Sequence, residues 1–405
     1  MTGRTVLLTG RGVVSPLGVG LVQHWEALCA GRTAVGRLDR LAGLPASRGA
    51  EVAPEALQPH LPRFSRKQQN RYNRPTLLAM LGAALAMDDA GLGPGAGDSS
   101  RFGVVLGVNT PAWNLDAMVA YLVASESRET PDVLDLPRAN GYCMRSINPL
   151  DFSLKTLPNL LAGHVAIAHD AQGCCRAMPE GHVGGACAVG DAGRLIAEGE
   201  LDVALCGGAD DQLEELFFTT QWGAGAIASD DGRPGLIPGE GSGLLVLEEA
   251  EHAVARGARC HGEIAGFASG GGGGRHPGED DPARLVERLA RVIDAVLAEA
   301  GDAPDLVSLH GDGIPAHDDA ERSALARVMG SSASSTPCLS MKSAHADLGA
   351  AASPVELLAC SAALEHATLP RVVSGHLLSP TPAYRSALVL SLGLFGECAA
   401  LMVRR

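Results

Sequence analysis

The sequence predicts a layered α/β protein made of two successive runs of alternating strands and helices. Along the 405 residues, short apolar runs that suit buried strands alternate with longer stretches of helical periodicity. Glycine and alanine are abundant and aromatic residues make up only 3% of the chain, so helices can pack closely against a sheet. These observations favour central sheets covered by helices over a β-sandwich.

The first run begins with a strand at 5–9, followed by a turn-rich segment and a helix at 21–29. The region 31–74 is irregular and rich in Pro and Arg, so we expect surface loops there. The helix at 75–90 is well marked, because a proline stands at its start and a glycine follows its end. The other elements expected in this run are strands at 102–108, 202–206 and 244–247, and helical segments at 115–123, 149–169, 186–196, from 213 onwards and at 250–256.

The second run begins with a strand at 261–267 and a strongly amphipathic helix at 282–300. Strands at 306–310, 338–341, 385–392 and 399–403 follow, with helices at 318–328 and 349–366. Strands and helices thus alternate over 1–255 and again over 256–405, and we expect a duplicated α/β fold with one half in each range. This duplication is inferred from element order, because the sequence contains no clear repeat.

Composition and charge limit the classes of function. The net charge of −14 argues against nucleic acid or an anionic membrane as the main partner. The ten cysteines lie in apolar or helical contexts without a secretory signal, so we expect reduced thiols in a cytoplasmic protein. No apolar run is long enough to span a membrane. We expect no metal site, because His164, His169 and His317 are scattered without ligand spacing.

A glycine-rich bend at Gly181–Gly185 leads directly into the expected helix at 186–196. Backbone N–H groups and the helix dipole stabilise a developing anion at a helix N-terminus, so an enzyme would place its nucleophile there. The tip of this bend carries His182 in place of Ser or Cys.

Four separated stretches resemble, in order and spacing, the β-ketoacyl synthases, which are condensing enzymes of the thiolase fold. Val6–Gly18 resembles the family's "GxGVVSPLG" segment, and Pro238–Glu248 resembles "GEGAGxLVLE". His310–Glu321 resembles "HGTGTPxxDxxE", and Lys342–Glu356 resembles the lysine/histidine segment. The resemblance covers essentially the whole chain and implies a thiolase fold with duplicated αβαβα layered halves.

The resemblance also implies positions for the catalytic groups. In this family a Cys holds the acyl chain as a thioester, and two histidines support malonyl decarboxylation and stabilise oxyanions. Ungapped spacing puts His182 at the Cys position, His310 at the first histidine and Asp347 at the second, with Lys342 retained. His345 lies two residues before Asp347 and would replace the second histidine only through a local shift. Without the thiol, the family's covalent catalysis is lost.

These departures resemble one subgroup of the family, the chain-length factors of type II polyketide synthases. In that subgroup the bend reads Glu-Gln-Ala-Gly-Gly, whereas this chain carries His182 and also retains His310, where the subgroup often has Asp. The resemblance implies a non-condensing subunit that forms a heterodimer with a catalytic ketosynthase and helps set polyketide or polyene chain length. An acyl carrier protein and the growing polyketide chain would be its other partners, and no cofactor is implied.

The resemblance further implies a substrate tunnel that reaches the subunit interface. Residues from 109–146, a polar and poorly periodic stretch, would cap it, with Met118, Tyr121 and Leu122 as contributors. Phe395 is a fourth candidate, from the segment 393–398, which is nearer the chain-length factors than the catalytic enzymes.

Other interpretations stay open at this point. The chain could instead decarboxylate malonyl-carrier protein with His182, His310 and a locally shifted His345, or be a divergent condensing enzyme with an unusual nucleophile. For His182 the favoured role is a neutral side chain that fills a vacated pocket, because the helix dipole disfavours imidazolium. The segment Pro238–Gly243 lacks the Lys-Ser/Thr pair of a phosphate loop, so we expect a turn packed near the active centre.

Overall fold

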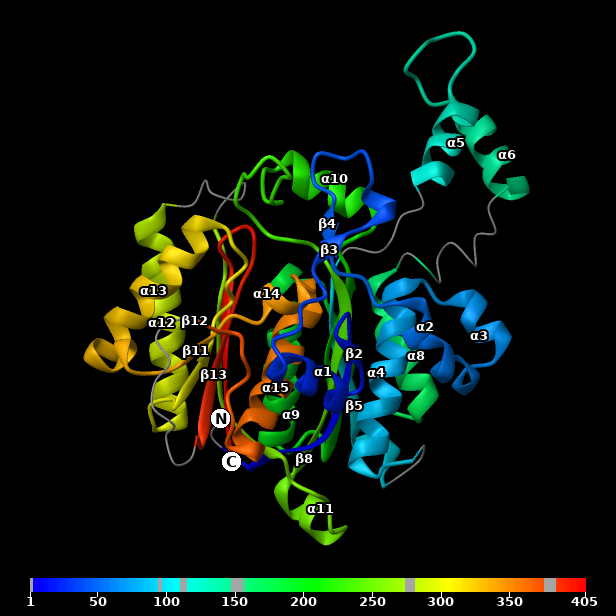
Figure 1. The fold of residues 1–405 in the computed structure, drawn as a ribbon. Helices are drawn as coiled ribbons and strands as arrows, with labels where there is room; N and C mark the ends of the chain where they lie inside the picture. The colour runs from blue at the N-terminus through cyan, green and yellow to red at the C-terminus, as the bar shows by residue number, and fades with distance from the viewer. Residues whose placement is uncertain are drawn as a thin grey trace.

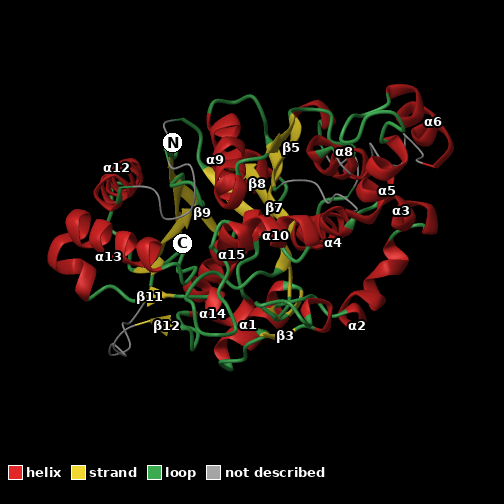
Figure 2. Cartoon of the chain, turned by 90° about the horizontal axis from the view of Figure 1, so that it is seen from above, coloured by secondary structure: helices red, strands yellow, loops and turns green. Residues whose placement is uncertain are grey.

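In the computed structural model, two half-sheets alternate with three layers of helices (Figure 1). The structure describes residues 3–93, 97–109, 115–146, 155, 157–273, 281–374 and 384–405. Residues 149–154 and 156 of the expected helix at 149–169 therefore lie outside the described residues. The view from above shows the same succession of helices and strands across the molecule (Figure 2).

Five strands form the first half-sheet, in the order β6-β5-β7-β8-β1. The pairs β1/β8 and β7/β8 are antiparallel, while β5/β7 and β5/β6 are parallel. Their bounds are β1 (Val6–Ser15), β5 (Phe102–Val108), β6 (Cys175–Met178), β7 (Val203–Asp211) and β8 (Glu240–Glu249). β5, β7 and β8 are buried along their whole length, which explains why they read as continuous apolar runs.

The second half-sheet repeats this pairing pattern in the order β11-β10-β13-β14-β9. Two antiparallel pairs, β9/β14 and β13/β14, are again followed by two parallel pairs, β10/β13 and β10/β11. The bounds are β9 (Gly262–Gly270), β10 (Leu306–Ser308), β11 (Cys338–Leu339), β13 (Ser386–Leu392) and β14 (Cys398–Arg404). The same order of pairing in both halves confirms the duplicated fold predicted from element order.

The two half-sheets meet where β1 pairs with β9, at Leu7/Glu263 and Leu8/Gly262. Between them lie the central helices α9 (Gly184–Ala197) and α15 (Ala352–His366), which share one apolar core with the inner faces of the strands. α15 is buried on nearly all sides, as expected for a helix in the middle layer. Two further cores lie under α4 (Arg74–Ala90) with α8 (Pro158–His169), and under α12 (Pro282–Ala300) with α13 (Pro315–Met329).

Local signals explain the ends of the best-predicted helices. The Asn73 side chain accepts a hydrogen bond from the Thr76 N–H at 2.9 Å and caps α4, and Gly91 ends it with φ 66°. Asp281 caps α12, and Gly301 ends that helix with φ 79°. Both φ values lie in the left-handed region, which glycine adopts without strain.

The sequence analysis was wrong about several segments, among them the expected turn-rich segment after 5–9, which belongs to β1 as far as Ser15. The region 31–74 holds α2 (Pro54–Leu57) and α3 (Arg66–Arg71), and Ser65 with Gln68 forms a capping box for α3. β6 was not expected, because only its pairing with β5 makes Cys175–Met178 a strand. α6 (Leu136–Ser146) was missed because Asn and Gly interrupt its middle. The remaining elements are α1 (Leu21–Cys29), β2 (Gly18–Val19), β3 (Gly36–Arg37), β4 (Arg48–Gly49), α10 (Glu215–Gly223), α11 (Ala250–Ala255), α14 (Lys342–His345) and β12 (Val373–Ser374).

A helical hairpin made of α5 (Leu115–Ser125) and α6 stands off from the layered body (Figure 1). The two helices pack on each other, with the Tyr121 and Tyr142 ring centroids 6.3 Å apart. Apolar side chains on the hairpin nevertheless remain exposed, namely Val119, Leu122, Val123, Val133, Leu134, Leu136 and Met144. No helix among the described residues is both long and apolar enough to cross a membrane.

Candidate functional site

The glycine-rich bend forms as predicted at the start of α9. Gly181 has φ 59°, and Gly181–Val183 makes one 3₁₀ turn before the helix begins at Gly184. His182 sits in this turn and is 3% exposed. The Ser391 hydroxyl donates to the His182 carbonyl oxygen at 3.2 Å, which ties the bend to β13 of the other half.

The paired glycines after His182 have a packing role. A Cβ at Gly185 would overlap the carbonyl oxygen of Ala350, and a Cβ at Gly184 would lie 2.7 Å from the carbonyl oxygen of Met178. Only glycine allows the N-terminus of α9 to approach both neighbours so closely. This approach brings His182 against the loop that precedes α15.

That loop is the counterpart of the bend in the second half. Ala346 and Gly349 have φ 66° and 58°, and a 3₁₀ turn at Gly349–Ala351 leads into α15. Asp347 lies between them and is 1% exposed. Its backbone N–H donates to the Ile237 carbonyl at 2.8 Å, and its carbonyl accepts from the Gly239 N–H at 2.8 Å. The segment that begins at Pro238 packs at the site as expected, but it is not a turn, because Pro238 and Gly239 form β-bridges and β8 begins at Glu240.

His182 and Asp347 are joined through Gln212. The Gln212 Nε2 lies 2.8 Å from Asp347 Oδ1 and 3.2 Å from His182 Nε2, while His182 Nε2 and Asp347 Oδ1 are 3.6 Å apart. The Gly349 N–H donates to the same Asp347 oxygen at 2.7 Å. An amide N–H₂ donates to both neighbours only when His182 Nε2 carries no proton, so this geometry suits a neutral imidazole.

Gln212 was missed by the sequence analysis. It follows directly on the end of β7, is fully buried, and occupies space between the two replaced catalytic positions. The available signal was a polar run, Asp210 to Gln212, at the carboxyl end of an apolar strand. Such a position at a strand end often carries site residues.

His310 occupies the other side of the site, after β10. Its backbone N–H donates to Glu321 Oε1 at 2.7 Å, and Lys342 Nζ donates to its carbonyl at 2.7 Å. Lys342 also pairs with Glu356 Oε1 at 2.8 Å. Burial and the neighbouring Lys342 charge lower the pKa of His310 to about 4, so its imidazole is neutral at pH 7.

The structure brings together His182, His310, Asp347 and Lys342. The His345 side chain does not join this group. The His182 and His310 rings lie edge to face with centroids 6.3 Å apart. Burial raises the pKa of Asp347, but its interactions with His182 and Lys342 outweigh burial and hold that pKa below its usual value. His345 instead packs beside His24, 5.7 Å between centroids, and its Nδ1 lies 2.7 Å from the Ala346 carbonyl.

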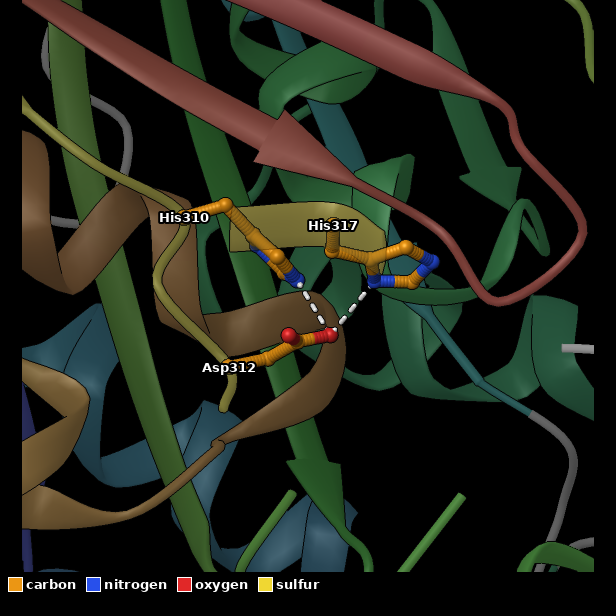
Figure 3. Close-up of side chains that lie close together, drawn as sticks. All are labelled: His310, Asp312 and His317. Atoms are coloured by element: carbon orange, nitrogen blue, oxygen red, sulfur yellow. Dashed lines mark hydrogen bonds and ion pairs between the residues drawn. The ribbon is translucent and has the colours of Figure 1, made fainter. Parts of the chain in front are cut away.

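A second buried group of side chains includes His310, Asp312 and His317. Figure 3 shows the His310 and His317 rings both turned toward the Asp312 carboxylate. His317 Nδ1 is 2.7 Å and His310 Nε2 is 3.3 Å from the same oxygen, Asp312 Oδ2. The sequence analysis treated His317 as scattered, although Asp312 stands where the family segment has Thr.

We tested whether these three donors fit a metal ion. Their donor atoms lie within 4.8 Å of one another, and this is the sole such group among the described residues. A tetrahedral zinc site with bonds of about 2.0–2.1 Å needs donor atoms roughly 3.3 Å apart. The 2.7 Å contact from His317 to Asp312 is shorter than that and suits a hydrogen bond. The cluster therefore fits a proton-bridged pair better than a metal centre.

A cavity of about 350 Å³ adjoins Asp312 and Asp347. Its other ionisable lining residues are Asp318, Glu321, Arg322 and Lys342. Carboxyl groups outnumber the cationic side chains in this lining. The surroundings of the site are thus poorly suited to a substrate that carries its own carboxylate.

The four tunnel candidates do not gather in the single chain. Met118 and Tyr121 are half-buried within the α5–α6 hairpin, and Leu122 is 54% exposed there. Phe395 lies in the turn between β13 and β14 and is 47% exposed. Glu397 of that turn approaches Gly181, so the Phe395 segment borders the bend while the hairpin does not.

No thiol takes the place of the missing nucleophile at the bend. Within the described residues, none of the ten cysteines forms a disulfide bond. Cys187 lies within α9, beyond the tip, and burial raises the pKa of its thiol. A thiol with a raised pKa is a poor nucleophile, because the thiolate is the reactive form.

The chain matches two family descriptions, "Beta-ketoacyl synthase, N-terminal domain" over residues 3–253 and "Beta-ketoacyl synthase, C-terminal domain" over residues 261–376. A Streptomyces halstedii protein named as a polyketide beta-ketoacyl synthase 1 is 34% identical over 386 residues, covering 91% of this chain and 87% of that protein.

Two solved structures share the fold over nearly their full length. One is from a type II polyketide synthase acyl-carrier protein in complex with its ketosynthase bound to the hexaketide (TM-score 0.80, 25% identity, 100% of both chains). The other is the ishigamide ketosynthase/chain length factor (TM-score 0.77, 26% identity, 100% of this chain and 99% of that chain). With both halves matched and the thiolase fold shared, this chain belongs to the β-ketoacyl synthase family.

Proposed function

We propose that this chain is a non-condensing, ketosynthase-like subunit, a chain-length factor, of a type II polyketide synthase. The observation that carries the proposal is the buried contact set His182–Gln212–Asp347 at the two replaced catalytic positions. These side chains contact one another in the space where the family holds an acyl thioester, and among the described residues Gln212 Oε1 and Asp347 Oδ2 have no hydrogen-bond partner. A buried imidazole, amide and carboxylate present no thiol nucleophile to a substrate.

Charge gives a second reason why this site does not condense malonyl units. Condensation in this family requires a malonyl carboxylate to enter and leave as carbon dioxide. Asp347 stands at the position of the second histidine, and both Asp347 and Asp312 have lowered pKa values, so they are ionised at pH 7. Like charges in a buried site repel strongly, and this also disfavours the alternative role of a malonyl-carrier-protein decarboxylase.

The α5–α6 hairpin supports the proposal that this chain binds a partner subunit. It stands off from the body and exposes Leu122 at 54% and Val123 at 66%. Contiguous exposed apolar side chains on a projecting element are typical of an interface that another chain covers. We propose that a catalytic ketosynthase covers it, and that Met118, Tyr121 and Leu122 reach the shared tunnel in that heterodimer.

The chain's own charge bears on the carrier protein. A net charge of −14 is a poor match for carrier proteins, which are acidic, so docking of the carrier would fall mainly to the ketosynthase partner. The growing polyketide would then extend into a tunnel shaped by both subunits.

Co-expression with a ketosynthase that keeps the Cys-His-His set tests this function. The expected result is a one-to-one complex by light scattering, with polyketide formation that needs both chains. A partner Cys→Ala variant is the control, and it should abolish product formation. If this chain is stable alone, forms no heterodimer and consumes malonyl-carrier protein by itself, the proposal fails and the decarboxylase role replaces it.

A further inference from the structure

Asp312 lies between two histidines in the interior of the protein. Its Oδ1 accepts the Ile314 N–H at 2.9 Å, and its Oδ2 faces both His317 Nδ1 at 2.7 Å and His310 Nε2 at 3.3 Å (Figure 3). All three side chains are nearly inaccessible to solvent. An ionised carboxylate only accepts, so each contact requires a proton on the facing ring nitrogen.

The positive charge of this cluster belongs on His317. Burial opposes it, but the hydrogen bond to Asp312 and the nearby Glu321 and Asp318 carboxyls outweigh burial and raise the pKa of His317. The pKa of His310 is shifted in the opposite direction, because its ring is buried and lies near Lys342. A neutral His310 that donates from Nε2 has no proton left on Nδ1.

The neighbours of His310 shift its pKa in both directions, because burial and Lys342 lower it while Asp312 and Asp347 raise it, and the lowering prevails. The titratable groups that face His310 are Asp312, His317, Lys342, Asp347, His182 and Glu321. Lys342 donates to the His310 carbonyl and Glu321 accepts its backbone N–H, so the main chain of His310 is held from both sides. With the backbone fixed, Asp312 decides which ring nitrogen carries the proton.

We propose that Asp312 and His317 are positioning residues that fix the tautomer of the neutral His310, with its Nε2–H given to Asp312 and thereby withdrawn from any acyl group. This inference rests on the proposed function and deepens it, because it explains how a retained histidine takes no part in condensation. A carbonyl oxygen would have to compete with an ionised carboxylate for that proton. Charge-assisted hydrogen bonds are stronger than neutral ones, so the carboxylate wins.

Nuclear magnetic resonance of ¹⁵N-histidine in the deuterated full-length chain tests this directly. Signals are assigned with His310→Gln and His317→Gln. We expect His310 to remain in a single Nε2–H tautomer from pH 5 to 9, and His317 to stay doubly protonated to a pH above its ordinary pKa. Asp312→Asn should make His317 neutral at pH 8 and let His310 populate the Nδ1–H tautomer. His169→Gln, on α8, is the matched control and should change neither signal.

Three outcomes would overturn the inference. They are an Nδ1–H His310 in the native chain, a His310 signal that Asp312→Asn leaves unchanged, or about one equivalent of bound zinc that Asp312→Asn removes. The native titration needs no variant, so a variant that fails to fold does not block the test. These measurements do not involve a partner subunit. The inference about His310 can therefore fail while the proposed heterodimer is confirmed, and the heterodimer can fail while the inference about His310 is confirmed.

Discussion

His182 and Asp347 lie 3.6 Å apart, Nε2 to Oδ1, with the Gln212 amide nitrogen within hydrogen-bonding distance of both. They come from the two bends that open the central helices α9 and α15, one in each half of the duplicated fold. The same positions hold the nucleophile and a histidine in condensing members of the family. Here they form a buried polar contact through the Gln212 amide.

Replacing His182 tests whether its side chain only fills the vacated pocket. We expect His182→Ala in the ketosynthase complex to leave product formation within about twofold of the native rate, because no step uses the imidazole. Product yield and chain length by mass spectrometry provide the measurement. A loss of malonyl decarboxylation with a folded complex would show instead that His182 works as an acid or base.

The close approach at Gly185 predicts a large and specific loss of stability. Gly185→Ala should destabilise the chain by about 3 kcal/mol or more, because its Cβ would overlap the Ala350 carbonyl and main chain cannot move aside cheaply. Gly163→Ala in α8 is the matched control, since a Cβ there meets nothing within 4 Å. That control should stabilise by about 0.5–1 kcal/mol. Urea unfolding distinguishes the two, and equal effects would contradict the packing argument.

Two buried histidines away from the site predict acid sensitivity. Burial, followed by the charge of its neighbour, lowers the pKa of His24 to about 3, and burial with Lys342 lowers that of His345 to about 4. Both are depressed below the unfolded value, so the unfolded chain binds more protons and stability falls as pH drops below 6.5. Each group should remove roughly 1 kcal/mol per pH unit until its folded pKa is reached.

Unfolding midpoints between pH 8 and pH 5 measure this effect. The native chain should lose stability steadily below pH 6.5, and His24→Asn should flatten that slope. Equal slopes for the two proteins would contradict the assignment of the effect to His24.

The hairpin predicts where the partner binds. Leu122→Asp should weaken the heterodimer by about 2 kcal/mol, which is roughly a 30-fold rise in Kd, because it puts a charge into an apolar contact. Val254→Asp on α11, at a residue 75% exposed, is the control and should change binding by less than about 0.5 kcal/mol. The Leu122→Asp and Val254→Asp variants should unfold at similar temperatures. If Leu122→Asp binds normally, the hairpin is not the interface.

Restoring the family residues predicts a gain of chemistry. In a complex whose partner Cys is Ala, His182→Cys with Asp347→His should give weak condensation. Adding Asp312→Thr should raise that rate about tenfold or more, because His310 then regains a free proton donor. Single-turnover assays with malonyl-carrier protein give the rates. No change on adding Asp312→Thr would mean that Asp312 does not restrain His310.

Much of the fold could be predicted because its signals are local. α1 and α12 begin and end where the sequence indicated, and β5 reads as one buried apolar run between polar flanks. Caps and turns act over a few residues and are visible in sequence. β6 could not be predicted, because pairing with β5 alone makes Cys175–Met178 a strand.

The sequence predicted which positions form the site, but not the side-chain contacts within it. Ungapped spacing brought His182, His310 and Asp347 to one place, and the structure puts them there. Gln212 enters from the end of β7, which only the tertiary fold brings near His182. His317 reaches Asp312 because the turn before α13 folds back on itself, a geometry that residue spacing does not reveal.

The most direct test of the central claim is acyl mapping in the reconstituted complex. Both subunits are incubated with labelled acyl- and malonyl-carrier protein, and peptides are then examined by mass spectrometry. The account predicts acyl groups on the partner's Cys alone, no acyl group on the peptide that contains His182, and no carbon dioxide release by this chain on its own. An acylated His182 peptide, or decarboxylation without the partner, would contradict it.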